Sequence, residues 1–74
     1  MDKHKQDVSY FISFCIEQYK NAKALEAKQV LDTFIEYEVI DYLSKHFEVL
    51  HTQNHHWILE EIDEFINKRK EKYK

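Results

Sequence analysis

The stretch "EVLHTQNHHWILEEID", residues 48–63, decides how the chain folds, because it joins two apolar segments through a run of polar side chains. Its first nine residues contain three histidines, a threonine, a glutamine and an asparagine. Asn54 stands directly before a run with helical apolar spacing, which is where a helix N-cap belongs. We therefore predict that residues 48–56 form a polar joint, capped by Asn54, between a short helix and the last helix.

Glycine and proline are both absent from the 74 residues, although average usage would give about five and about four. Tight hairpins, phosphate-binding loops and nucleophile elbows depend on glycine for a positive φ or a close backbone approach. The absence of glycine and proline therefore indicates an all-α fold, a small bundle of three or four helices. The length allows one domain, over residues 1–74.

Apolar spacing predicts where these helices lie. Asp7 would cap the first helix, and Asn21 could supply its C-terminal turn. Residues 36–43 also carry β-tolerant side chains, but no partner strand is evident. The expected helices cover 7–23, 26–36, 39–48 and a segment that begins after Asn54.

One face of each expected helix is apolar and should pack in the core. The predicted inward residues are Val8, Phe11, Ile12, Cys15 and Tyr19 in the first helix, Val30, Leu31, Phe34 and Ile35 in the second, Ile40, Leu43 and Phe47 in the third, and Ile58, Leu59, Ile62, Phe65 and Ile66 in the fourth.

The net charge of −3 conceals a strong segregation along the chain. Residues 26–64 contain ten acids and two lysines, a net of −8, whereas "KRKEKYK" at 68–74 contains five bases and one acid, a net of +4. The acidic body disfavours nucleic-acid binding, which needs lysines and arginines on one face. The single cysteine fits a reducing compartment, and neither a signal peptide nor a membrane span is apparent. We expect a cytoplasmic protein.

The histidines at 51, 55 and 56 raise the question of a metal site. On one continuous helix, His51 and His55 would share a face and could bind zinc. The glutamate of the H-E-x-x-H motif is missing, because position 52 is threonine, and an N-cap at Asn54 would separate the two histidines. We expect polar loop and cap residues here, with no metal and no cofactor.

Catalysis is not expected. Cys15 lies on the apolar stripe of the first helix, and a thiol buried among apolar groups is inert. The carboxylates of Glu60, Glu61, Asp63 and Glu64 point in several directions on a helix, which favours a solvated face. These acids near the start of the last helix and the bases near its end also suit the helix dipole.

Large aromatic side chains are more numerous than a core of this size must hold. Trp57 stands at the start of the last helix, and Tyr42 lies in the third. Tryptophan and tyrosine are frequent anchors at protein interfaces. Both residues are therefore candidates for an interaction surface, although a core built from rings with polar tips in water is the alternative.

The order of several motifs resembles a family of uncharacterised bacterial domains of about 70 residues. The motifs are "FCIEQYKNAK" at 14–23, "KQVLDTFIEYEVIDYL" at 28–43, "HFEVLHTQ" at 46–53 and "ILEEIDEFI" at 58–66. The family is often encoded beside small proteins, some of them similar to ADP-ribosyltransferases. The resemblance thus implies an accessory or toxin–antitoxin role.

Five residues match the most recognisable positions of that pattern, namely Glu17, Tyr19, His51, Thr52 and Asp63. They mark where a functional site would lie, or His51 and Thr52 could instead tie the loop 49–54 to Glu17 or Asp63 by hydrogen bonds. Family members usually carry glycines in the first connector and after L-H-T. Their loss here suggests that the backbone needs no positive φ, or that Asn21 and Asn54 substitute.

The expected function is non-catalytic binding of another protein, or of a second copy as a homodimer. An antitoxin-like role toward a basic neighbour is its most specific form, because the acidic region 26–64 would steer a positive partner. The alternative is a small nucleic-acid-associated regulator that uses the basic tail and the first helix.

Overall fold

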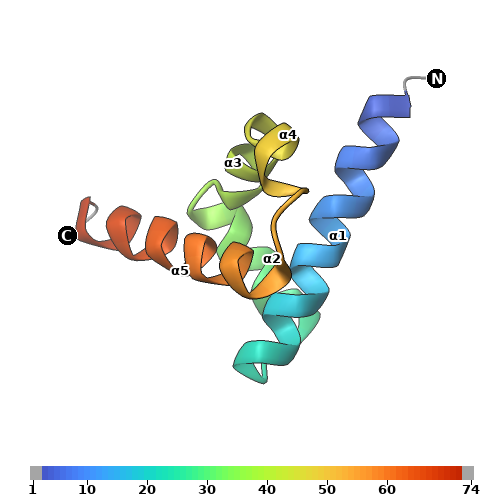
Figure 1. Cartoon of the computed structure of the whole chain (residues 1–74). Helices are drawn as coiled ribbons and strands as arrows, with labels where there is room; N and C mark the ends of the chain where they lie inside the picture. The colour runs from blue at the N-terminus through green and yellow to red at the C-terminus, as the bar shows by residue number, and fades with distance from the viewer. Residues whose placement is uncertain (1–2, 73–74) are drawn as a thin grey trace.

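The computed structural model describes residues 3–72, and these residues form five helices and no strand. Figure 1 shows their arrangement. The predicted all-α class is confirmed. The helices are α1 (Lys3–Lys23), α2 (Ala27–Glu36), α3 (Val39–Lys45), α4 (Phe47–Leu50) and α5 (His55–Lys72).

The two long helices, α1 and α5, meet at an angle, and the short helices α3 and α4 lie in the space between them, with α2 behind (Figure 1). α1 packs against α2, α3 and α5, and α3 also packs against α2, α4 and α5. The N-terminal end of α1 and the C-terminal end of α5 lie far apart, on opposite sides of the molecule (Figure 1). The core therefore lies where the middle of α1, the short helices and the first half of α5 meet.

The core is made from one apolar face of each helix, as the spacing predicted. Phe34, Leu43 and Ile62 have no exposed surface, and no buried polar side chain occurs among the described residues. The remaining buried residues are Phe11, Cys15, Tyr19, Val30, Val39, Phe47, Leu50, Ile58 and Ile66. Two predicted core residues, Leu31 and Ile35, are exposed instead, with 40% and 61% of their surface accessible, because α2 packs into the core through Val30 and Phe34.

The start of α1 differs from the prediction. The helix begins at Lys3, so Asp7 is an exposed residue within it and not its N-cap. Residues 3–6 are polar and contain no helix breaker. His4 also contacts Phe47, with ring centroids 5.5 Å apart, so tertiary contact supports the extra turn.

The connector after α1 uses a left-handed residue. Ala24 has a φ of 54°, and the N–H of Leu25 donates to the carbonyl of Lys20 at 3.0 Å, while that of Ala24 donates to Asn21 at 3.4 Å. This pair of bonds is the Schellman C-cap. The expectation that no positive φ is needed here is wrong, and Asn21 does not substitute for the glycine, because Ala24 itself takes the left-handed conformation.

The predicted third helix is divided in two. His46 has φ −107° and ψ 17°, outside the helical region, so α3 ends at Lys45 and α4 adds one turn, Phe47–Leu50. Both Phe47 and Leu50 are buried. The break lets these two side chains reach the core, an effect of packing that helical spacing alone does not reveal.

The polar joint is confirmed at its cap and over residues 51–54, but it is shorter than the predicted 48–56, because residues 48–50 belong to α4 and residues 55–56 to α5. Asn54 caps α5, because its side-chain oxygen Oδ1 accepts a hydrogen bond from the N–H of Trp57 at 3.0 Å. α5 begins at His55. The second predicted helix is also confirmed at its end, Glu36, and starts one residue late, at Ala27, with Glu26 as its N-cap.

Candidate functional site

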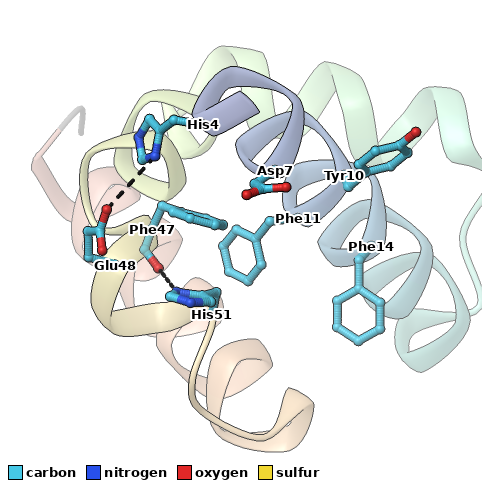
Figure 2. Close-up of a pocket in the computed structure, with 8 residues that line it drawn as sticks. All are labelled: His4, Asp7, Tyr10, Phe11, Phe14, Phe47, Glu48 and His51. Atoms are coloured by element: carbon cyan, nitrogen blue, oxygen red, sulfur yellow. Dashed lines mark hydrogen bonds and ion pairs between the residues drawn. The ribbon is translucent and has the colours of Figure 1, made fainter. Parts of the chain in front are cut away.

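An open groove of about 570 Å³ lies between the N-terminal half of α1 and α4. Figure 2 shows its lining side chains. One wall comes from α1, where four lining residues follow one another at spacings of 3, 4 and 3 residues and Tyr10 lies beside them. The opposite wall comes from α4 and from His51, which follows it. The lining residues are His4, Asp7, Tyr10, Phe11 and Phe14 from α1, and Phe47, Glu48 and His51 from the other side.

Ring contacts hold the floor of this groove together. Phe11 meets Phe47 edge to face, with centroids 5.5 Å apart. His51 stacks on Phe47 at 4.4 Å, and its Nδ1 lies 2.6 Å from the carbonyl oxygen of Phe47. His4 closes one end, with its Nδ1 3.9 Å from a carboxylate oxygen of Glu48 (Figure 2). The floor is thus fixed by packing between α1 and α4.

The rim of the groove carries exposed aromatic rings. Tyr10 is 75% exposed and Phe14 is 44% exposed, whereas Phe11 and Phe47 beneath them are buried. Asp7 and Glu48 are the acidic lining residues, and no lysine or arginine lines the groove. Rings beside carboxylates suit an apolar group that carries a positive charge, since aromatic faces also attract cations.

A second polar cluster joins α1 to α5. The hydroxyl of Tyr19 donates to Asp63 at 2.9 Å, and the ammonium of Lys23 lies 2.7 Å from the other oxygen of Asp63. Burial, followed by the bond to Asp63, raises the pKa of Tyr19 above its ordinary value of 10.0. The hydroxyl therefore stays protonated and links the two helices.

The five residues of the family pattern do not form one site. Tyr19 and Asp63 meet, but His51 bonds to the carbonyl of Phe47 and the hydroxyl of Thr52 donates to the carbonyl of Val49 at 2.8 Å. Glu17 pairs with Lys20 at 3.4 Å. The expected bonds from His51 and Thr52 to Glu17 or Asp63 are wrong, because α4 supplies nearer carbonyl oxygens to both residues.

The histidines of the joint lie on different elements. His51 follows α4, whereas His55 and His56 open α5, with their ring centroids 4.3 Å apart. Within residues 3–72, no group of three or more His, Cys, Asp or Glu side chains is placed to hold a metal ion.

Cys15 is enclosed in the core, with 1% of its surface exposed. Burial raises the pKa of its thiol to about 12. The thiol is therefore protonated at neutral pH, and the nucleophilic thiolate form is disfavoured.

Two predicted aromatic candidates have different surroundings. Tyr42 is half-buried and stacks on Phe65 at 4.3 Å, where burial and the nearby carboxylates of Glu61 and Glu64 raise the pKa of its hydroxyl. Trp57 is 38% exposed at the first turn of α5. Neither residue lines the groove between α1 and α4.

Sequence reasoning missed the groove itself. The signal was present in α1, where positions 4, 7, 11 and 14 fall on one helical stripe. That stripe could not be recognised as a site wall, because the helix was expected to start at Asp7 and α4 was expected to continue α3.

Within the described residues, no helix is both long and apolar enough to cross a membrane.

The fold and the groove define a small all-helical domain with an open groove that is lined largely by aromatic side chains. Residues 10–69 match the family described as "Protein of unknown function (DUF3791)". The match covers most of the chain, so the protein belongs to this family, and the resemblance to an uncharacterised domain family is confirmed. No curated protein and no solved structure matches the chain.

Proposed function

We propose that this protein is a non-catalytic interaction module that binds a partner protein in the groove between α1 and α4. The observation that carries the proposal is the exposure of Tyr10 and Phe14, 75% and 44%, above a floor of buried rings. Exposed aromatic side chains over an ordered apolar floor resemble the residues that dominate binding energy in protein interfaces.

The charges around the groove indicate the chemistry of that partner. Asp7 and Glu48 line the groove, and no lysine or arginine is among the lining residues. The segment 26–64 has a net charge of −8. A field of this sign raises the rate of encounter with a positively charged surface. The proposed partner presents an apolar side chain flanked by lysine or arginine.

An antitoxin-like or accessory role is the most specific form of the proposal. It joins the acidic groove to the expectation from the family resemblance that a small protein is encoded beside this one. The buried, protonated thiol of Cys15 supports a role in binding over one in nucleophilic catalysis.

The basic end of α5 gives less support to the nucleic-acid alternative. Its side chains interact within the molecule, because Lys68 pairs with Glu64 at 3.2 Å and Arg69 pairs with Glu38 at 3.1 Å. Arg69 also lies over the ring of Phe65, 4.8 Å from its centroid. Phosphate binding would have to compete with these contacts.

Co-expression with the product of the adjacent gene tests the proposal. The two proteins should co-purify at about 0.05 M salt and separate largely at about 0.5 M, where the Debye length is only a few Å. The double substitution Tyr10→Ala and Phe14→Ala should abolish co-purification without unfolding the domain, because both rings are exposed.

Val49→Ala is the matched control, since Val49 is 60% exposed on α4 and does not line the groove. It should leave binding unchanged. The absence of co-purification even at about 0.05 M salt, or full binding by the double variant, would contradict the proposal.

A further inference from the structure

A second hollow, of about 410 Å³, lies between α2 and α3. Ile35 is 61% exposed beside it, and Leu31, one turn earlier on α2, is 40% exposed. We name the surface formed by this hollow and Leu31 the α2–α3 cleft. Phe34, Ile35, Glu38, Ile40, Asp41 and Ser44 line the hollow.

The junction between α2 and α3 shapes the cleft. Glu38 has a φ of 60°, and this left-handed residue turns the chain so that α3 leaves at an angle to α2. Ile40 then comes from α3 to the same hollow as Ile35 from α2. Two apolar side chains from different helices, with Leu31 one turn away, form an apolar strip of the kind that an amphipathic helix can cover.

Carboxylates dominate the edge of the cleft. Glu38 and Asp41 line it, and Asp32 and Glu36 are exposed on the adjacent face of α2. Lys45 lies 3.2 Å from Asp41, and Arg69 lies 3.1 Å from Glu38. The lining of the hollow itself contains two acids and no lysine or arginine, so with Asp32 and Glu36 beside it the edge is acidic.

We propose that the α2–α3 cleft is a docking site for an amphipathic basic helix of a partner protein. Its apolar side chains, spaced by three or four residues, would cover Leu31, Ile35 and Ile40, as in other helix-in-groove interfaces. Its lysines or arginines would face Asp32, Glu36 and Asp41. This surface shares no lining residue with the groove between α1 and α4, so the inference does not depend on the proposed function.

A second copy of this chain does not suit the cleft. A two-fold dimer sets the same surface against itself. Asp32, Glu36 and Asp41 would then approach acids of the other copy, and like charges placed opposite each other in an interface are unfavourable. The occupant is therefore a different, basic chain.

The probe is an unlabelled, designed helical peptide. It consists of leucine, alanine, lysine and arginine, with the leucines along one stripe. Titrated into 15N-labelled protein at low salt, it should shift the amide signals of Leu31, Ile35, Ile40 and Ser44 and leave those of Tyr10 and Phe14 unchanged. Ile35→Glu should weaken binding by about tenfold or more, equivalent to about 1.4 kcal/mol. Because Ile35 is exposed, circular dichroism should show this variant folded.

Two controls make the result decisive. Val49→Glu places the same charge at a residue of nearly the same exposure, 60% against 61% for Ile35, and should bind as the unsubstituted protein does. A peptide with glutamate at every lysine and arginine position should not bind. The inference is overturned if the basic peptide does not bind, if it shifts the groove signals instead, or if both peptides bind equally. Self-association that Ile35→Glu abolishes would overturn it too.

Discussion

Ala24 shows how a single residue can adopt a conformation that its type disfavours. Its φ of 54° ends α1 in a Schellman C-cap, a position that glycine usually fills because it lacks the Cβ that clashes in the left-handed region. The two bonds to Lys20 and Asn21 and the packing of Leu25 against the core hold the turn in place. The C-cap therefore forms although the Cβ of Ala24 disfavours the left-handed conformation.

Ala24→Gly should therefore stabilise the protein. Relief of the left-handed conformation is worth about 1–2 kcal/mol, reduced by the greater freedom of glycine in the unfolded chain, so we expect a net gain of about 0.5–1 kcal/mol. Urea unfolding followed by circular dichroism measures it. Ala22→Gly, within α1, should instead destabilise by about 0.5–1 kcal/mol. Equal destabilisation by both substitutions would refute the left-handed conformation of Ala24.

At the scale of elements, helices that are far apart in sequence are joined by a few specific contacts. The bond from Tyr19 to Asp63 connects α1 to α5 across 44 residues, and Lys23 adds an ion pair to the same carboxylate. Phe47 connects α4 to α1 through Phe11 and His4. These contacts fix the angle between the long helices and the width of the groove.

Tyr19 should make stability depend on alkaline pH. Its pKa is raised in the folded protein, by burial first and by Asp63 second, above the ordinary 10.0. Above pH 10 the unfolded chain loses this proton while the folded protein retains it, so the contribution is complete below pH 10 and is lost as pH rises further.

Tyr19→Phe should cost about 1 kcal/mol near pH 7, through the lost hydrogen bond, and should reduce the decline of stability above pH 10. Urea unfolding at a series of pH values measures both effects. Tyr10→Phe controls for removal of a hydroxyl from an exposed ring. An unchanged alkaline decline in Tyr19→Phe would contradict the role of this hydroxyl.

At the scale of the whole molecule, a chain of 74 residues has one small core and little reserve of stability. A domain of this length typically unfolds at a cost of about 4–11 kcal/mol. Phe34 has no exposed surface and contacts Tyr19 edge to face, with centroids 5.3 Å apart. It lies where α1 and α2 meet.

Phe34→Ala should remove most of the stability, because truncation of a buried phenylalanine costs about 3–5 kcal/mol. Thermal and urea unfolding should show a transition at a much lower temperature and urea concentration, or a protein that is already unfolded at the start. Ile35→Ala, next in sequence but exposed, should cost less than about 1 kcal/mol. Similar losses for the two variants would mean that Phe34 is not the centre of the core.

The sequence by itself determined the all-α class, the end of α2, the cap at Asn54 and the burial of Cys15. These features depend on local backbone propensity, capping and apolar spacing, and each can be read within about one turn of helix. Tertiary packing decided the break at His46, the longer α1 and the exposure of Leu31 and Ile35, and it placed Tyr19 beside Asp63 and α1 beside α4. The groove between α1 and α4 and the α2–α3 cleft depend on how the helices pack against one another. The apolar spacing along one helix does not encode how many other helices cover it or at what angle they cross it.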